Sequence, residues 1–235
     1  GVDRAECVPM IGRHDQHGVD VFAIEQRAVV AIRRRLAVGH RDLVSVDDHD
    51  VVAEVHVRGV VRAVLPAQAQ GDVIAFLDDD DWWTDRDYLS LTSHAFENGA
   101  ALCFGDGIMA FEDGREQTSF AFDADAKSLE RDNTILISAV TYRRSLHDSL
   151  GPFDESLPFY WDWDWYLRVA RAGSSLVHLS RPVVAFRVHA RNMSGGALER
   201  QRRENLDRFS AKHGLPPLIL KNHLNLVTDL PPDRR

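Results

Sequence analysis

Four consecutive carboxylates directly follow a short apolar run in this chain. Val73–Leu77 leads into Asp78, Asp79, Asp80 and Asp81. Two unit charges ~5 Å apart repel each other by ~3 kcal/mol at an effective dielectric of ~20, so a cation would stabilise such a cluster. Hard divalent cations such as Mg²⁺ and Mn²⁺ favour carboxylate oxygens. The run therefore indicates a metal site, with a solvated acidic turn as the alternative, because Asp is also common in turns and at helix N-caps.

A second group of candidate residues opens a predicted helix at WDWDWYLRVARAG. At 3.6 residues per turn, Asp162 and Asp164 point ~200° apart, so only one of them can face a shared site. Asp162 and Tyr166 lie on nearly the same face, and Asp162 is in the first turn, where the helix dipole favours a carboxylate. The alternative is that Asp162 only caps the helix while Trp161 and its neighbours supply core.

The third signal is Phe186-Arg187-Val188-His189, which reads as the end of a strand that carries a cation and an imidazole. A single His is weak evidence for a ligand, because a His can equally be an ordinary surface residue. This segment supports a ligand site only when it is considered together with the two acidic segments.

Alternating apolar runs and helical patterns indicate the elements that would hold these residues. Residues 19–24 and 43–46 are predicted strands around a helix over 27–38, and 73–77 is the clearest strand. Ligands of open α/β sheets lie outside the carboxyl ends of the strands, so Asp48 and Asp80 should face one crevice. The expected fold is α/β, a mostly parallel sheet flanked by helices in a single domain.

The rest of the chain is predicted to form further helices and strands. Its expected elements are helices over 87–97, 161–172 and 198–213, strands over 135–142 and 183–188, and strands 101–104 and 108–111 around a Gly-Asp-Gly turn. We expect residues 1–104 and 105–214 to form the two halves of this domain, and 215–235 a C-terminal tail.

Composition limits the class of protein. The 235 residues are 44% apolar and 27% charged, enough for one substantial core, and the formal net charge of −8 argues against a nucleic-acid partner. Cys7 and Cys103 are too few for a disulfide framework. No apolar run reaches the ~18 residues of a transmembrane segment. We expect a cytoplasmic protein, and peripheral association with a membrane stays open.

Three segments, in order, resemble the GT-A-fold family 2 glycosyltransferases: GDVIAFLDDDDWW, GPFDESLPFYWDWDWYLRVARAG and FRVHARNMS. The specific resemblance covers about residues 59–196. It implies an inverting enzyme that uses Mn²⁺ or Mg²⁺ and transfers a sugar from a nucleotide-sugar donor to a saccharide or another hydroxyl acceptor. Residues 1–104 would then be the nucleotide-sugar-binding half, and residues 105–214 the acceptor-binding and catalytic half.

The resemblance also implies roles for individual residues. Asp80 would hold the metal that bridges the donor diphosphate, and Asp78 would lie near the ribose or the metal. Asp162 would be the general base, His189 would meet the metal or the diphosphate, and Asp48 would recognise the donor base.

Three further residues complete the predicted site. Arg187 would help to stabilise the departing diphosphate, and Trp161 and Tyr166 would lie on the substrate side, Trp161 at a position where the family usually has Glu. Asp79 and Asp81 are expected to matter less, because alternate strand positions point away from each other.

Two other functions stay open. The family's first strand runs into a Pro-Thr-Tyr-Asn-like turn, whereas Ile24 is followed here by Glu25-Gln26-Arg27, so the donor-binding region is divergent. Such a chain could be a non-catalytic nucleotide- or carbohydrate-binding remnant of the fold. A nucleotidyltransferase would share the acidic strand ends, but no segment resembles its glycine-rich phosphate loop.

Overall fold

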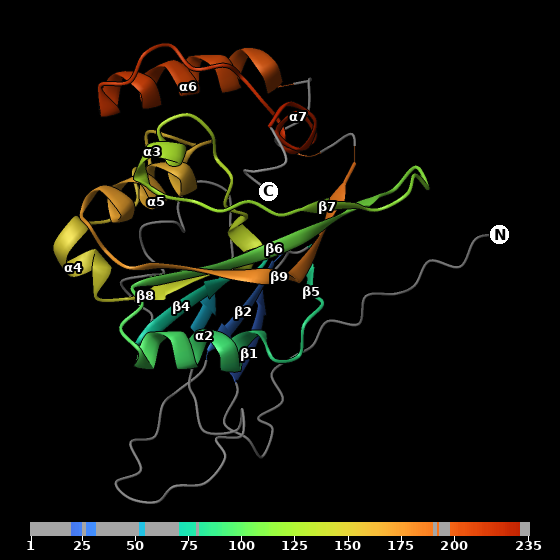
Figure 1. The fold of residues 1–235 in the computed structure, drawn as a ribbon, viewed down its shortest axis with the longest axis vertical. Helices are drawn as coiled ribbons and strands as arrows, with labels where there is room; N and C mark the ends of the chain where they lie inside the picture. The colour runs from blue at the N-terminus through green and yellow to red at the C-terminus, as the bar shows by residue number, and fades with distance from the viewer. Residues whose placement is uncertain are drawn as a thin grey trace, which may run out of the picture.

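The computed structural model describes residues 71–78, 80–189, 192 and 198–230, together with the backbone of strands at 20–24, 27–31 and 52–54. Figure 1 shows helices on both sides of a central sheet. The elements are β1 (Asp20–Ile24), β2 (Arg27–Ala31), β3 (Val52–Glu54), β4 (Val73–Phe76), β5 (Trp82–Trp83), α2 (Tyr88–Glu97), β6 (Leu102–Phe111), β7 (Thr118–Phe120), α3 (Ala126–Leu129), the 3₁₀ helix η2 (Ile137–Ala139), β8 (Val140–Arg143), α4 (Leu146–Leu150), α5 (Trp161–Arg171), β9 (Leu176–Val188), α6 (Glu199–His213) and α7 (His223–Asp229).

The central sheet has seven strands in the order β3-β4-β8-β6-β9-β5, with β7 on β6. Within the described strands of this sheet, β3/β4 and β6/β9 are parallel pairs, whereas β8 runs antiparallel to both β4 and β6. The predicted α/β fold is confirmed, but the sheet is mixed instead of mostly parallel. The reason is that β8 lies between β4 and β6, where Tyr142 pairs with Ile74 on one side and Leu102 on the other.

Both faces of the sheet are covered because its strands are apolar on both sides. Along β6, Leu102 and Phe104 enter the core cluster shared with α5, whereas Cys103 packs with Phe96 of α2 on the opposite face. Successive strand residues point to opposite faces, which explains this division. Figure 1 shows α2 on one side of the sheet and α5 and α6 on the other.

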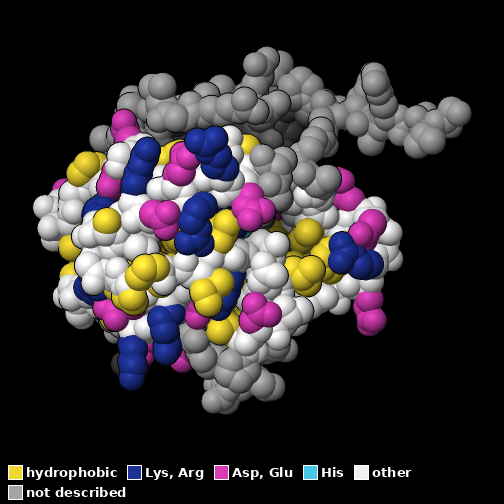
Figure 2. All heavy atoms as spheres, turned by 90° about the horizontal axis from the view of Figure 1, so that it is seen from above, with side chains coloured by type: hydrophobic (Ala, Val, Ile, Leu, Met, Phe, Trp, Pro, Cys, Tyr) yellow, Lys and Arg dark blue, Asp and Glu magenta, His cyan; other side chains and the backbone are white. Residues whose placement is uncertain are grey.

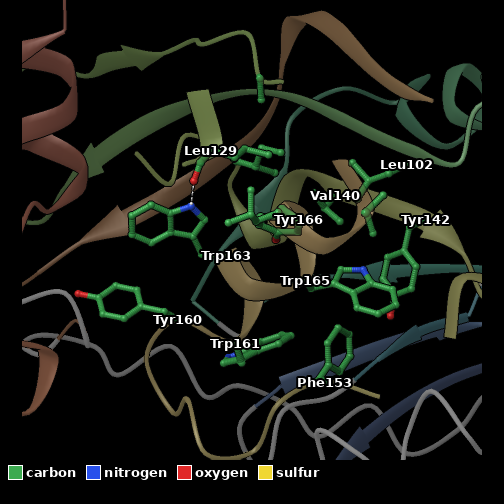
Figure 3. Packing of buried hydrophobic residues seen from close by; sticks show 14 of the residues in the cluster. Leu102, Leu129, Val140, Tyr142, Phe153, Tyr160, Trp161, Trp163, Trp165 and Tyr166 are labelled. Atoms are coloured by element: carbon green, nitrogen blue, oxygen red, sulfur yellow. Dashed lines mark hydrogen bonds between the residues drawn. The ribbon is translucent and has the colours of Figure 1, made fainter. Parts of the chain in front are cut away.

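The core beneath α5 is largely aromatic (Figure 3). Trp165 is 1% exposed and lies with its ring centroid 5.0 Å from that of Phe153 and 5.4 Å from that of Tyr142. The indole N–H of Trp163 donates to the carbonyl of Leu129 at 2.7 Å, so this buried polar group is satisfied. These contacts fix the rotation of α5 and hence the direction of its first turn.

The N-terminal prediction is wrong in one respect. A helix was expected over 27–38, but the structure has β2 at Arg27–Ala31, paired antiparallel with β1 in a hairpin. Val29 and Val30 favour the extended backbone, and the hairpin satisfies its hydrogen bonds locally. The expected strand over 43–46 lies outside the described residues.

The expected Gly-Asp-Gly turn is not a turn. Residues 102–111 form one continuous strand, β6, whose register against β9 shifts around Asp106. Both glycines are needed for close packing, because a Cβ on Gly105 would collide with Val183 and one on Gly107 with Leu136. Glycine in a strand interior often marks such a bulge or close approach.

The C-terminal segment carries a helix that the sequence analysis did not predict. Asn222 caps α7, since its side chain accepts a hydrogen bond from the Asn225 N–H at 2.9 Å. Leu226 of α7 is 4% exposed and packs in the cluster that contains Phe120 and Phe186. The apolar side of α7 therefore packs on the core.

Candidate functional site

Most of the predicted site residues meet at one cavity of about 400 Å³. Its lining includes Asp78, Asp80, Trp161, Asp162, Arg187 and His189. They come from the end of β4, the first turn of α5 and the end of β9. Asp48 lies outside the described residues, so its predicted contact with the donor base stays a prediction.

Three carboxylates form the acidic end of this cavity. Among the described residues, Asp78, Asp80 and Asp81 offer ligand oxygens that all lie within 4.8 Å of one another. The Asp81 N–H donates to the Asp78 carbonyl at 3.0 Å, which closes a turn and brings Asp81 back beside Asp78. The expectation that Asp81 points away is therefore wrong, because strand alternation ends with β4 at Phe76. We call these three residues the carboxylate triad.

Ser138 of η2 fixes the triad. Its hydroxyl accepts the Asp78 N–H at 3.0 Å and donates to Asp81 Oδ2 at 2.5 Å. The Arg187 N–H donates to Asp81 Oδ1 at 3.2 Å. The sequence did not identify Ser138 because it lies about 60 residues away in the chain, within a run predicted to be an ordinary strand.

The triad is electrostatically strained without a cation. Burial, and to a lesser extent the charges of Asp78 and Asp80, raise the pKa of Asp81 to about 7. A divalent cation would favour the ionised form of all three side chains, and carboxylate oxygens are the ligands that Mg²⁺ and Mn²⁺ prefer. The residues present thus fit a hard metal ion.

The end of β9 contributes a guanidinium and an imidazole to the cavity lining. His189 Nε2 lies 3.0 Å from Asp80 Oδ2, in agreement with the expected closeness of these two residues. The Arg187 guanidinium lies 5.6 Å from the ring centroid of Trp82. Trp82 directly follows Asp81 in the chain and is 40% exposed, so its ring and the cation lie next to the carboxylates.

Asp162 lies in the first turn of α5 and lines the same cavity. The side-chain amide of Asn133 donates to Asp162 Oδ2 at 3.1 Å, which orients the carboxylate. Trp161, predicted on the substrate side, lines the cavity but is only 8% exposed. Its ring packs edge-on against Phe76 at 5.7 Å and Phe153 at 4.9 Å, so Trp161 chiefly anchors the start of α5.

The structure does not bring Tyr166 to the cavity. Tyr166 is 1% exposed and belongs to the core between α5 and the sheet (Figure 3). Tyr166 lies on the same helix face as Asp162. One turn further along α5, however, this face packs against the sheet and no longer lines the cavity. Burial, followed by the charge of Asp162, raises the pKa of its hydroxyl well above the usual value.

Asp164 is a structural residue that joins two helices. Its carboxylate is fully buried and lies 2.8 Å from Arg168, 2.6 Å from Lys212 and 2.8 Å from His213. Burial acts to raise its pKa, but the hydrogen bonds from His213 and Lys212 and the charge of Arg168 outweigh burial and lower the pKa to about 2. The prediction that Asp164 faces away from the Asp162 site is thereby explained.

Sequence reasoning missed a group of charged residues that also line the cavity. Arg131, Arg202 and Lys221, which we call the basic corner, line it together with Asp132. Lys221 Nζ lies 2.8 Å from Asp132 Oδ1, and the Arg202 guanidinium donates to the Lys221 carbonyl at 2.5 Å. No local pattern marks these residues, since they come from three segments that only the fold of the C-terminal region assembles.

Comparison with known proteins gives a family match. Residues 46–148 match the model of Glycosyl transferase family 2. The matched range includes the carboxylate triad but ends before Asp162, Arg187 and His189. A Bacillus subtilis (strain 168) protein, the uncharacterized glycosyltransferase YwdF, is 33% identical over 175 residues, which are 72% of this chain and 65% of that protein.

Solved structures of S. aureus TarS resemble this chain less closely. One is 16% identical with a TM-score of 0.43 and covers 65% of this chain and 27% of that chain. TarS 1–349 in complex with UDP is 18% identical with a TM-score of 0.41, over 56% of this chain and 40% of that chain.

No helix among the described residues is both long and apolar enough to span a membrane. The sequence matches show that residues 46–148 are similar to glycosyltransferase family 2, and the chain spans slightly less than two thirds of the length of the curated relative that it matches.

Proposed function

We propose that this protein transfers a sugar from a nucleoside-diphosphate donor to an acceptor hydroxyl, with inversion and with help from Mn²⁺ or Mg²⁺. One observation carries the proposal: the carboxylate triad and Asp162 line the same cavity of about 400 Å³. A metal-and-diphosphate end and a general base are the two parts that a single displacement needs.

The donor end is formed by the triad, Arg187 and His189. Asp80 and Asp81 would hold the metal, Asp78 would meet the ribose or the metal, and His189 would support Asp80 from 3.0 Å away. A divalent cation bound there would neutralise the negative charge that develops on the departing diphosphate. Arg187 and Trp82 lie beside this end, where a cation favours phosphate oxygens and an indole face favours a ring.

Asp162 is the proposed general base. As the acceptor oxygen forms its bond to the anomeric carbon, the bond from that carbon to the diphosphate oxygen breaks, and Asp162 takes the proton of the acceptor hydroxyl. A single displacement inverts the configuration at the anomeric carbon. The hydrogen bond from Asn133 holds the carboxylate in place for this step, at 3.1 Å.

Two alternatives make different predictions about ligands. A non-catalytic remnant would bind a carbohydrate or nucleotide without releasing nucleoside diphosphate from a nucleotide-sugar. A nucleotidyltransferase would require a nucleoside triphosphate. Asp48 lies outside the described residues, and its contact with the donor base is part of the proposal.

The first test measures nucleotide binding by calorimetry. We expect one member of a panel of nucleoside diphosphates (UDP, GDP, ADP, CDP) to bind with Mn²⁺ present and much more weakly with EDTA. Asp80→Asn should weaken this binding at least tenfold, because it removes a carboxylate ligand without changing shape. The matched control is Asp72→Asn, an exposed carboxylate just before β4.

The outcomes separate the proposals. Binding that is indifferent to Mn²⁺, or equally tight in Asp80→Asn and the parent, would contradict the metal-assisted mechanism. Metal-dependent binding without any release of nucleoside diphosphate from the matching nucleotide-sugar would favour the non-catalytic remnant.

A further inference from the structure

We propose that His223 of α7 is a specificity-determining residue, whose imidazole hydrogen-bonds a second hydroxyl of a saccharide acceptor while Asp162 takes the proton of the first. This inference rests on the proposed function and deepens it, because it states how the acceptor is recognised. No bond to His223 forms or breaks during the transfer, and Asp162 remains the base.

The ring of His223 differs from the other histidine rings in its hydrogen bonding. It makes no hydrogen bond within the part of the chain that the structure describes. The other described histidines each have a ring nitrogen within 3.3 Å of a hydrogen-bonding atom: His94, His147, His178, His189 and His213. Polar groups in a protein interior normally have such a partner. Because His223 lines the cavity, a bound ligand can supply the partner that the described chain does not.

Aromatic contacts hold the His223 ring in place at the cavity wall. Its centroid lies 5.3 Å from that of Phe120 and 5.2 Å from that of Phe186, edge-on in both cases. The residue is nevertheless only half-buried, and it lines the cavity. A ring that packing already holds loses little conformational freedom when a ligand binds to it. The imidazole is therefore preorganised for a directed hydrogen bond.

The imidazole is uncharged at neutral pH. Burial, followed by the positive charge of Arg202, lowers the pKa of His223 to about 4. A neutral imidazole has one N–H donor and one acceptor nitrogen. A hydroxyl group can likewise donate and accept, whereas an ionised carboxylate only accepts. The ring of His223 therefore matches a hydroxyl better than it matches a carboxylate.

Short contacts connect His223 with the proposed base. Lys221, two residues before His223, pairs with Asp132 at 2.8 Å, and the adjacent Asn133 donates to Asp162 at 3.1 Å. His223 and Asp162 line the same cavity of about 400 Å³, a size typical of small-molecule sites. One acceptor molecule can thus offer one hydroxyl to Asp162 and another to His223.

Apolar side chains accompany His223 in the cavity lining. Ile219 and Leu224 line the cavity near it in the chain, and Ile219 is 74% exposed. Such side chains make no hydrogen bonds but can pack against C–H groups. A saccharide ring carries both C–H groups and several hydroxyls, so it suits this combination of apolar and neutral polar groups. An acceptor with a single hydroxyl, such as a serine side chain, would leave the imidazole without a partner.

The surface outside the cavity does not offer another basis for selection on the face that carries α6. Figure 2, seen from the side that carries α6 in Figure 1, shows Lys and Arg side chains interspersed with Asp and Glu. An acceptor would find no continuous patch of one charge on this face. Selection of the acceptor therefore belongs to the cavity lining.

The direct test observes the His223 ring in the parent protein by NMR. The protein is saturated with Mg²⁺, which does not broaden the signals as Mn²⁺ does, and with the nucleoside diphosphate that it binds best. It is titrated with the methyl β-glycosides of glucose, galactose and N-acetylglucosamine, and with N-acetylserinamide as the single-hydroxyl compound. We expect at least one glycoside to shift the His223 signal and N-acetylserinamide to leave it in place. The signal is assigned by its absence from His223→Phe.

His223→Phe also tests the contribution to affinity. Phenylalanine keeps an aromatic ring beside Phe120 and Phe186 but removes both nitrogens. It should weaken the glycoside about threefold to tenfold, the loss of one neutral hydrogen bond, without changing the affinity for the nucleoside diphosphate. The matched control is His94→Phe, because the His94 side chain is 78% exposed on α2. Circular dichroism of each variant verifies that it is folded.

Three results would overturn the inference. They are a His223 signal that no glycoside shifts, an equal shift with N-acetylserinamide, and a His223→Phe variant that binds the glycoside as tightly as the parent. A variant that instead loses affinity for the matching nucleotide-sugar, and not for the glycoside, would assign His223 to the transferred sugar. A parent in which a glycoside shifts His223 but no nucleoside diphosphate binds with Mg²⁺ or Mn²⁺ would support the saccharide site and contradict the proposed function.

Discussion

Asp81 lies in an environment that disfavours its ionised form. Ser138 and the Arg187 backbone hold its carboxylate among like charges, and burial together with Asp78 and Asp80 raises its pKa to about 7. A group whose pKa is raised in the folded protein destabilises that state wherever it must ionise. In the metal-free protein, this cost grows as the pH rises from about 4 to about 7 and is constant above.

We therefore predict that Asp81→Asn stabilises the metal-free protein. Asn can still accept the Ser138 hydrogen bond but carries no charge, so the gain should be on the order of 2 kcal/mol at pH 8 and small near pH 4. Urea unfolding in EDTA at both pH values measures it. The same variant should lose affinity for Mn²⁺. An unchanged or lower free energy of unfolding at pH 8 would mean that Asp81 is not strained.

Asp162 is predicted to act on the rate and not on stability. Asp162→Asn keeps a side chain that can accept the Asn133 hydrogen bond, so the free energy of unfolding should change by less than ~1 kcal/mol. Loss of a general base typically lowers the rate by ~10² to 10⁴. A single-turnover assay with the identified donor and acceptor measures this, with Asp148→Asn on the exposed side of α4 as control. Turnover at the parent's rate with intact nucleotide binding would remove Asp162 from the mechanism.

At the scale of elements, the position of Asp162 depends on the junction between α5 and α6. Asp164, two residues further along α5, pairs with Lys212 and His213 at the end of α6 and with Arg168 on its own helix. The carboxylate is fully buried, so its partners must stay in place to satisfy it. The junction therefore fixes the rotation of α5 and the direction of its first turn.

We predict that Asp164→Asn destabilises the fold by about 2–4 kcal/mol at pH 7, because it removes the buried charge on which Arg168, Lys212 and His213 converge. The folded-state pKa of Asp164, about 2, is below its usual 3.8. Its contribution, on the order of 2 kcal/mol, is thus complete above pH ~4 and is lost as the pH falls through about 2. Thermal unfolding between pH 2 and 7 should show a shallower acid dependence in the variant than in the parent. Parallel pH profiles would contradict this role.

The elements that the sequence predicted well are those with a strong local pattern. The apolar run of β4 and the helices α2, α5 and α6, each followed by a glycine, lie within a few residues of their expected positions. β2 was missed because Arg27-Ala28-Val29-Val30-Ala31 suits either a helix or a strand, and its partner strand decides. The prediction of a turn at Gly105-Asp106-Gly107 was wrong. The two glycines are required because a Cβ there would collide with Val183 or Leu136, which are distant in the chain.

At the scale of the whole molecule, the acidic half of the site was predictable and the basic half was not. Asp78, Asp80, Asp162 and His189 lie at ends of elements that the sequence marks clearly, and the fold brings them to one cavity. Arg202 and Lys221 come from α6 and the segment before α7, where charged residues look like an ordinary solvated surface. Only long-range packing of the C-terminal segment turns them inward.

That packing gives the last prediction, which asks whether residues 215–230 are a detachable tail or part of one cooperative unit. Leu226 of α7 is 4% exposed in the cluster with Phe120 and Phe186. Leu226→Ala should therefore lower the free energy of unfolding by about 2–4 kcal/mol, as expected for a buried leucine. Thr228→Ala, on the exposed side of the same helix, is the matched control and should change it by less than ~0.5 kcal/mol.

Because Lys221 lies only five residues before Leu226, loosening α7 should also disturb the basic corner. Urea unfolding followed by both far-UV circular dichroism and tryptophan fluorescence should give a single transition for the parent and for Leu226→Ala. Nucleoside-diphosphate affinity should persist in this variant under native conditions, because the carboxylate triad is fixed by η2 and β9. An unchanged midpoint in Leu226→Ala would mean that α7 is not part of the cooperative core.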